Sequence, residues 1–587
     1  FSSPIKLPFI VSLLLIILSY IKKLNKLELL IIRAPFKNMS NPDQIWFNGL
    51  IETLDVQKPF ATAIAISQGR IIAVGNDEDI LNLKQSGTKI VNLYKKFLMP
   101  GLVESHTHAL WGACKKLFDV SVDFNSSLDD LLGATKSRVA MASQDTVVIG
   151  GPWRIDMLEN IDENPKNILD RLAPDTPVVL EDTTQHSLWC NTKVIELVGM
   201  ETLSGDFKDG IAQKDNDGNL NGIFSEGACR PIRSKLKRTE SQLKEASSHF
   251  VELFNQYGIT SFKEPMADED NLSAYKKFDE TGQLTLHMAA HISKFSPLTS
   301  GEISFEKLEK LRRDYKSENI RTDFAKLFLD GVAPTFTASF FDPYTIKSGY
   351  DNDNHDPEKT LLMDFDNLSN VLGELDNRGF TTKIHAVGDY AIHTAINAIE
   401  NTRKKNGFSG LRHEIAHCPF VIEDDLKRFK KLDIVAEVSP KLWFPNPMTK
   451  AQIHVLGHER VQKCHPIKSL LNSGASVTYA SDWPAGTPDP NPWIGLAGMI
   501  SRKDPNNNYD GYIGKDEAIS LQQALPIFTI NGAKSLGMEK ETGTISIGKW
   551  ADFIVLEKPI QNYSIQEIAN MKVHQTIWKG RIVYSVD

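Results

Sequence analysis

Cysteine is scarce in this chain, and its spacing excludes two classes of structure. The 587 residues include five cysteines and no Cys-x-x-Cys pair; they are Cys114, Cys190, Cys229, Cys418 and Cys464. An odd, scattered set argues against a disulfide framework and against a zinc site made of thiolates. A reducing compartment fits this pattern best, and we expect a cytoplasmic protein.

The sequence also lacks an excess of positive charge. Its 66 Lys and Arg residues are outnumbered by 74 Asp and Glu residues, which gives a formal net charge of -8. Nucleic acid is therefore not an expected partner. Internal repeats and long low-complexity tracts are absent too. The length suits one large globular domain with a smaller one.

No apolar run reaches the length of about 20 residues that a membrane-spanning helix needs. The nearest approach is residues 8–20, PFIVSLLLIILSY, which precede three lysines and a second run, LELLII. A signal-peptide core or a signal anchor would make the protein secretory or membrane-anchored. We favour a third interpretation, in which translation starts at Met39 and residues 1–38 are not part of the mature fold.

Both ends of the remaining chain contain short, strand-like runs. Ile45-Trp46-Phe47 and the hairpin signal Gly69-Arg70 lie near the start, and Phe553-Ile554-Val555-Leu556 lies near the end. We expect residues 39–98 and 539–587 to form one small β-sandwich domain from both ends of the chain.

Between these ends, apolar β-type runs alternate with helical segments, a pattern typical of parallel βα units. Besides the run before His106, the expected strands are 146–150, 177–180, 258–262, 325–329, 381–385, 413–417, 434–438 and 476–480. The pattern predicts an α/β fold with a distorted (β/α)8 TIM barrel over residues 99–538. Active sites of such barrels lie at the C-terminal ends of the strands.

Two histidines end the first of these strands. His106 and His108 are two residues apart, and residues i and i+2 of a strand project from the same face. Two such imidazoles suit a single metal ion. His385 and His417 end two later strands, which favours a common metal centre over four independent polar residues. By the same period of two, His413 would share the inward face with His417, deeper in the barrel.

A lysine and an aspartate occupy comparable positions. Period two places Lys326 between two inward phenylalanines, where burial favours a neutral amine that can take up carbon dioxide as a carbamate. On local sequence alone, a lysine that reaches solvent is the better interpretation. Lys263 is a rival to Lys326 for this role. We rank Lys263 lower, because the adjacent Glu264 offers it a partner for an ion pair. Asp482 ends a buried run, either as a helix N-cap or as a metal-bound general base.

The motifs PGLVESHTH, KLFLDG, KIHAVGD, RHEIAH and ASDWP, in this order, resemble the amidohydrolase superfamily. The resemblance is greatest to the amidohydrolase family 3 branch, which is N-substituted formamide deformylase-like, and it covers residues 46–584. It implies that His106 and His108 bind a buried ion, that carboxylated Lys326 bridges two ions, and that His385 and His417 bind the second. Asp482 would contact the buried ion and act as the catalytic base and acid.

The same resemblance implies a hydrolase of carbon–nitrogen bonds other than peptide bonds. Its substrate would be a small N-substituted amide or formamide, attacked by metal-bound hydroxide with one or two divalent ions. Zinc suits the nitrogen and oxygen ligands best. Trp153, His186 and Arg460 match substrate-binding positions, and a homodimer is expected. Thr184-Gln185 before His186 and Ala416 before His417 depart from the usual pattern, which bears on substrate specificity.

Two alternatives remain open. A deaminase of the same fold would carry a glutamate soon after His385, where this sequence has Ala386-Val387-Gly388-Asp389. A catalytically inactive scaffold would have lost metal ligands, whereas all six are present.

Overall fold

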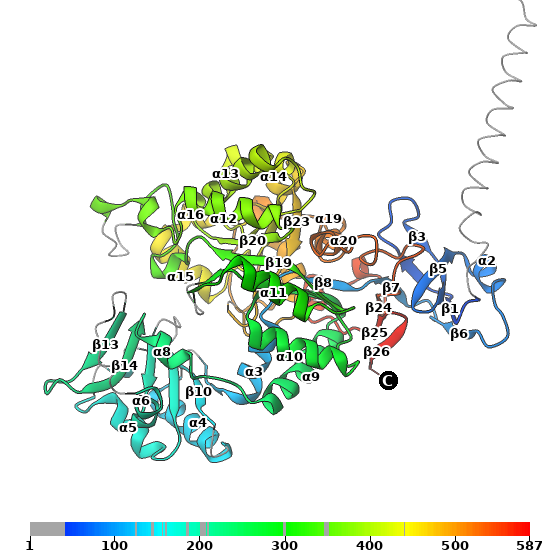
Figure 1. Cartoon of the computed structure of the whole chain (residues 1–587). Coiled ribbons are helices and arrows are strands. Elements are labelled where there is room, and N and C mark those ends of the chain that lie inside the picture. The colour runs from blue at the N-terminus through cyan, green and yellow to red at the C-terminus, as the bar shows by residue number, and fades with distance from the viewer. Residues whose placement is uncertain are drawn as a thin grey trace, which may run out of the picture.

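The computed structural model describes residues 41–586 (Figure 1), except 124–125, 143–145, 155–156, 159–160, 183–186, 200–202, 204–206, 208–209, 297–300, 346–351, 440 and 486. The predicted N-terminal segment 1–38, the proposed start at Met39 and the predicted pocket residue His186 therefore lie outside the described residues. Within the described part of the chain, no helix has the length and apolar character needed to cross a membrane.

Eight parallel strands form the central sheet. In spatial order they are β8 (Leu102–Glu104), β15 (Ile259–Ala267), β16 (His287–Ser293), β19 (Ile320–Phe328), β20 (Thr381–Ala386), β21 (Glu414–His417), β22 (Val435–Val438) and β23 (Ser476–Tyr479). The first and last strands meet where they end: the Ser105 N–H donates to the Tyr479 carbonyl at 3.0 Å, and the Asp482 N–H donates to the His106 carbonyl at 2.8 Å. The prediction of a distorted (β/α)8 barrel is confirmed.

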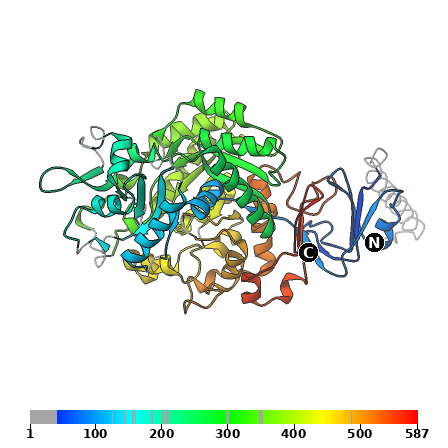
Figure 2. The same ribbon diagram turned by 90° about the horizontal axis from the view of Figure 1, so that it is seen from below.

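Amphipathic helices surround this sheet (Figures 1 and 2). They include α9 (Glu240–Gln256), α10 (Glu269–Glu280), α11 (Phe305–Tyr315), α12 (Phe365–Asn377), α13 (Asp389–Asn406) and α14 (Glu423–Leu432). In α12, Asp364 caps the first turn, and Leu368, Leu372 and Leu375 are buried. This spacing of four and three residues places one apolar stripe against the outer face of the barrel.

Residues 120–226 form a second sheet that the sequence did not separate from the barrel. Its strands are β9 (Val120–Ser121), β10 (Val148–Trp153), β11 (Val178–Asp182), β12 (Ser187–Cys190), β13 (Gly210–Lys214) and β14 (Leu220–Glu226). The expected barrel strands at 146–150 and 177–180 belong to this sheet, so their assignment was wrong, and β16 was missed. Apolar periodicity shows that a segment is a strand, but not which sheet it joins.

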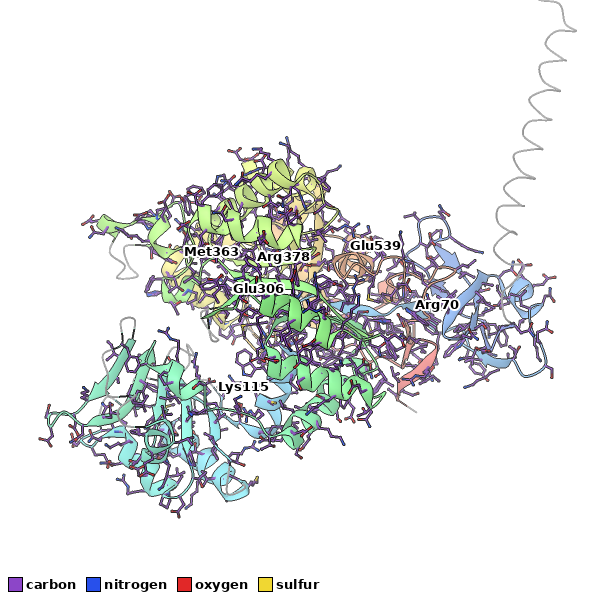
Figure 3. All side chains as sticks on the ribbon, viewed as in Figure 1. Arg70, Lys115, Glu306, Met363, Arg378 and Glu539 are labelled. Carbon is purple, nitrogen blue, oxygen red and sulfur yellow. The ribbon has the colours of Figure 1, made fainter. Side chains whose placement is uncertain are left out.

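Both ends of the chain contribute to the small β structure, as predicted. One sheet combines β2 (Leu50–Glu52), β3 (Phe60–Ala61) and β7 (Phe97–Pro100) with β24 (Phe553–Leu556), β25 (Gln575–Trp578) and β26 (Arg581–Ser585). The other contains β1 (Gln44–Phe47), β4 (Ala63–Ser67), β5 (Arg70–Gly75) and β6 (Lys89–Asn92). Trp46 of one sheet packs edge-on against Phe553 of the other, with ring centroids 5.2 Å apart. Arg70 (Figure 3) adds an ion pair to Glu541 at 2.9 Å.

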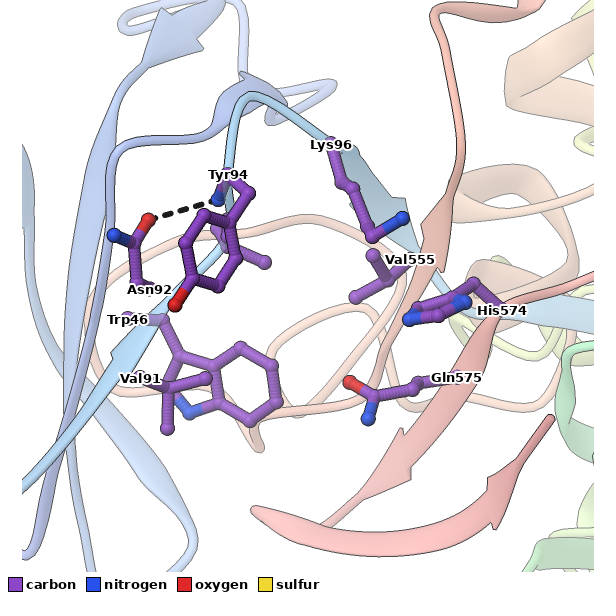
Figure 4. A pocket seen from close by; sticks show the side chains of 9 residues that line it. Trp46, Val91, Asn92, Tyr94, Lys96, Val555, His574 and Gln575 are labelled. Carbon is purple, nitrogen blue, oxygen red and sulfur yellow. Dashed lines mark hydrogen bonds between the residues drawn. The ribbon is translucent and has the colours of Figure 1, made fainter. Parts of the chain in front are cut away.

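A cavity of about 390 Å³ lies at one edge of this two-sheet structure. Trp46 and Tyr94 line one side, and His574 and Gln575 line the other (Figure 4). None of the predicted metal ligands contributes to its lining. The cavity is therefore separate from the candidate metal centre.

Candidate metal centre

His106 and His108 lie at the C-terminal mouth of the barrel, directly after β8. Gly101 links β7 of the small domain to β8. A Cβ added at this position would lie 2.3 Å from Thr260 Oγ1, so glycine allows the backbone to pass this close to the Thr260 side chain. His106 Nε2 lies 3.4 Å and His108 Nε2 lies 3.5 Å from Asp482 Oδ1. All three side chains are buried.

These distances suit one divalent ion. Ligand atoms that are each about 2.0–2.1 Å from a tetrahedral zinc ion lie about 3.3 Å from one another. His106, His108 and Asp482 offer ligand atoms that all lie within 4.8 Å of one another. Burial opposes charge on His108, yet its hydrogen bonds to Asp482 and Glu264 outweigh that effect and raise its pKa to about 9. The two carboxylates, Asp482 and Glu264, thus favour positive charge around His108.

His385 and His417 form a second pair beside the first. His385 Nδ1 lies 3.0 Å from His417 Nε2, whereas their other nitrogens face the Gly331 carbonyl at 3.1 Å and Ser439 Oγ at 2.9 Å. The ring centroids of His417 and His106 are 5.0 Å apart, which brings the two pairs into one cluster. Two nitrogens that face each other at this distance also suit one metal ion.

Backbone geometry explains how His417 reaches the cluster. Its φ is +75°, and that of Asp482 is +55°, in the left-handed region that costs a non-glycine residue about 1–3 kcal/mol. This conformation breaks the strand alternation. The expected inward position of His413 is therefore wrong: His413 Nε2 lies 3.0 Å from Asp376 Oδ1 of α12, and Glu414 points into the barrel.

Lys326 is buried close enough to both histidine pairs for its charge to act on them. It is 1% exposed, and burial, assisted by the charge of Lys383, lowers its pKa to about 7. After burial itself, the charge of Lys326 is among the causes that lower the pKa values of His106, His385 and His417. At pH 7 about half of such a buried amine is neutral, and the neutral form has the chemistry needed to form a carbamate.

Lys263, the rival to Lys326, forms an ion pair with a glutamate of another strand. Lys263 Nζ donates to Glu414 across the barrel rather than to the adjacent Glu264, so the expected local salt partner was wrong. Among the ion pairs formed by the described residues, Lys326 takes part in none, although it is buried. This contrast favours Lys326 as the bridging group.

Two glutamates orient the first pair of histidines. Glu437 Oε1 lies 2.5 Å from His106 Nδ1, and Glu264 Oε1 lies 3.3 Å from His108 Nδ1. Metal-binding histidines usually donate their second N–H to such an acceptor, which leaves the other nitrogen free to bind the ion. Sequence reasoning missed Glu437, although a lone charge in the apolar strand Val435–Val438 was a usable signal.

The other predicted pocket residues stay outside this cluster. Trp153 is buried in the core of the second sheet, where its Nε1 donates to the Leu180 carbonyl at 3.0 Å. Arg460 donates to the carbonyls of Asp342 and Pro343 at 3.4 and 3.1 Å. Their roles in substrate binding remain predictions.

Comparisons with known proteins identify a family and similar chains. A profile of the amidohydrolase family matches residues 89–584. The chain is 28% identical over 559 residues to Protein LONG AFTER FAR-RED 3 from Arabidopsis thaliana, with 92% of each chain covered. It is 24% identical over 561 residues to N-substituted formamide deformylase from Arthrobacter pascens, which covers 92% of this chain and 98% of that one. A solved uncharacterized metal-dependent hydrolase from Pyrococcus furiosus has a TM-score of 0.69 and 24% identity, covering 88% of this chain and 99% of that one.

Proposed function

This chain is a metal-dependent hydrolase of the amidohydrolase family, and we propose that it cleaves the carbon–nitrogen bond of N-substituted amides, formamides in particular. The observation that carries the proposal is the cluster at the barrel mouth. It combines two groups of ligand atoms with a buried lysine that forms no described ion pair. The similarity to N-substituted formamide deformylase supports the choice of formamides.

In this proposal the cluster would hold two divalent ions. His106, His108 and Asp482 would hold one ion, and His385 and His417 the other, with Lys326 as a carbamate between them. Nitrogen and oxygen donors suit zinc. A bound divalent ion would polarise the substrate carbonyl and lower the pKa of water from 15.7 to about 7.

Asp482 is the proposed general base and acid. Its Oδ1 faces His106 and His108, and its Oδ2 lies 3.9 Å from His417 Nδ1, so its carboxylate adjoins both histidine pairs. From this position it would accept the proton of the attacking water and return it to the departing nitrogen. Without that proton the nitrogen would leave as a poor amide anion.

Deamination is the less favoured alternative. In the segment after His385, the N–H groups of Val387 and Gly388 donate to the Asp330 carboxylate at 2.9 and 2.8 Å. Asp330 also accepts the Ser339 N–H at 3.0 Å, so its oxygens are occupied in holding two loops together. These three hydrogen bonds give the Asp330 carboxylate a structural role. Asp330 therefore does not replace the glutamate that a deaminase would carry soon after His385.

A substrate panel tests the proposal. The zinc-loaded chain would be incubated with N-substituted formamides, other N-acyl amines and amino-substituted heterocycles, while formate, amine and ammonia are measured separately. We expect formate and amine in equal amounts from the formamides. Ammonia from the heterocycles, with no hydrolysis of any amide, would contradict the proposal and favour a deaminase.

Two further properties belong with this proposal. All five cysteines are buried thiols, which supports a reducing, cytoplasmic location. A homodimer is the proposed assembly, and its mass in solution is the direct check.

A further inference from the structure

A row of alternating charges crosses the barrel interior beside the metal cluster. It consists of Lys263, Glu414, Lys383 and Glu437, whose side chains all have 0% exposure. Lys263 donates to Glu414, Lys383 Nζ lies 3.3 Å from the second Glu414 oxygen, and Lys383 donates to Glu437. We call these four residues the charge row. Its two cations and two anions compensate one another, which reduces the cost of burying them.

Glu437 is the member of the row that touches a predicted metal ligand. One carboxylate oxygen lies 2.5 Å from His106 Nδ1, and the other accepts from Lys383. Lys383 also donates to the Ser105 carbonyl at 2.7 Å. One ammonium group thus holds both the carboxylate behind the His106 ring and the backbone just before it.

We propose that Glu437, held in place by Lys383, is a positioning residue that fixes the ring orientation and tautomer of His106 and thereby sets metal affinity. The inference rests on the proposed function, because it concerns the ion held by His106, His108 and Asp482. With Nδ1–H bound to Glu437, the Nε2 lone pair of His106 faces Asp482 at 3.4 Å.

The corresponding contact at His108 is weaker. Glu264 lies 3.3 Å from His108 Nδ1 and is held by the neutral hydroxyl of Tyr275 at 2.7 Å. The contact at His106 is shorter, and its carboxylate is held by an ammonium ion, which adds the attraction between two opposite charges that a neutral hydroxyl cannot supply. We therefore assign control of metal affinity to Glu437 rather than to Glu264.

Zinc titration of the metal-free, full-length chain against a chromophoric chelator tests this inference. In Glu437→Gln, the affinity of the tighter site should fall about 10- to 100-fold, as is typical when a partner behind a metal-binding histidine is lost. The matched control is Glu414→Gln, which removes a charge from the same row but contacts none of the predicted ligands. Its zinc affinity should stay within about threefold of wild type.

A second variant covers the case in which Glu437→Gln does not fold. Glu437→Asp preserves the charge of the row but is too short to reach both His106 and Lys383, and it should also bind zinc at least about tenfold more weakly. Wild-type affinity in the folded Glu437 variants, or an equal loss in Glu414→Gln, would overturn the inference. A wild-type chain that takes up no zinc would overturn the proposed function and this inference with it.

Discussion

Asp482 combines two features at one residue: a left-handed backbone and a carboxylate shared between two histidines. Its φ of +55° turns the side chain toward His106 and His108 instead of continuing the direction of β23. The cost of this conformation is offset by the Asp482 N–H, which donates to the His106 carbonyl at 2.8 Å. This geometry places the carboxylate of the proposed base beside the two histidines with which it would bind the ion.

Replacing Asp482 by Asn should separate proton transfer from metal binding. The amide oxygen can still face a cation, whereas the amide accepts no proton from water. We expect kcat to fall about 10²- to 10⁴-fold, the usual contribution of general acid–base catalysis, while zinc content stays above half that of wild type. Steady-state kinetics and elemental analysis of the same preparation measure both quantities. Activity within tenfold of wild type would remove Asp482 from the mechanism.

His465 provides a second test at the residue scale, away from the metal cluster. It is completely buried, its ring nitrogens have no hydrogen-bond partner in the described part of the chain, and Trp443 packs against it with ring centroids 5.6 Å apart. Burial, assisted by the charge of Arg502, lowers its pKa to about 3. The folded protein therefore keeps this ring neutral.

The pH dependence follows from the sign of this shift. A lowered histidine pKa gives stability that is complete above the unfolded value of about 6.5 and is lost as pH falls toward 3, a loss of about 2 kcal/mol at pH 5. His465→Leu should abolish that part of the loss in urea unfolding at pH 8 and pH 5. The exposed His458→Gln is the control. If His465→Leu and wild type lose the same stability between these pH values, the buried neutral ring does not contribute.

At the scale of elements, the loop after β20 depends on a glycine. A Cβ at Gly388, which precedes α13, would lie 1.9 Å from the Ser339 carbonyl oxygen, a backbone atom that cannot move aside locally. This loop follows His385, so its packing also holds the end of a strand that carries a predicted ligand.

Gly388→Ala should therefore destabilise the protein by at least about 2 kcal/mol, in the range of overpacked cores. Gly373→Ala is the matched control, since Gly373 lies within α12 and an added Cβ meets nothing within 4 Å. That substitution should stabilise by about 0.5–1 kcal/mol through helix propensity. Urea unfolding of both variants measures the difference. Equal stabilities would contradict the close contact at Gly388.

The sequence predicted the positions of strands better than it predicted which side chains contact one another between strands. Period two correctly placed Lys326 on the same face as Phe324 and Phe328, because β19 pairs with β20 without a register shift over these residues. The same rule failed for His413, since the turn at His417 reverses the alternation. Lys383 was visible two residues before His385, but its partner Glu437 comes from a strand 54 residues later. No local pattern specifies such a pairing.

For the molecule as a whole, the difficult prediction was the second sheet. Residues 120–226 have strands as apolar as those of the barrel, and only their pairing shows that they form a separate sheet. The two-ended β domain was easier to predict because both ends carry similar strand patterns. It also contacts the barrel through Asp552, whose carboxylate lies 2.8 Å from His287 Nε2 of β16.

Metal content of the purified full-length chain tests the central claim most directly. Elemental analysis should find about one to two equivalents of a transition metal in the wild-type chain. A variant with both His106→Asn and His108→Asn should lose the ion held with Asp482. Less than about a tenth of an equivalent in wild type, even after growth and dialysis with zinc, would contradict the metal centre and the hydrolytic function proposed for it.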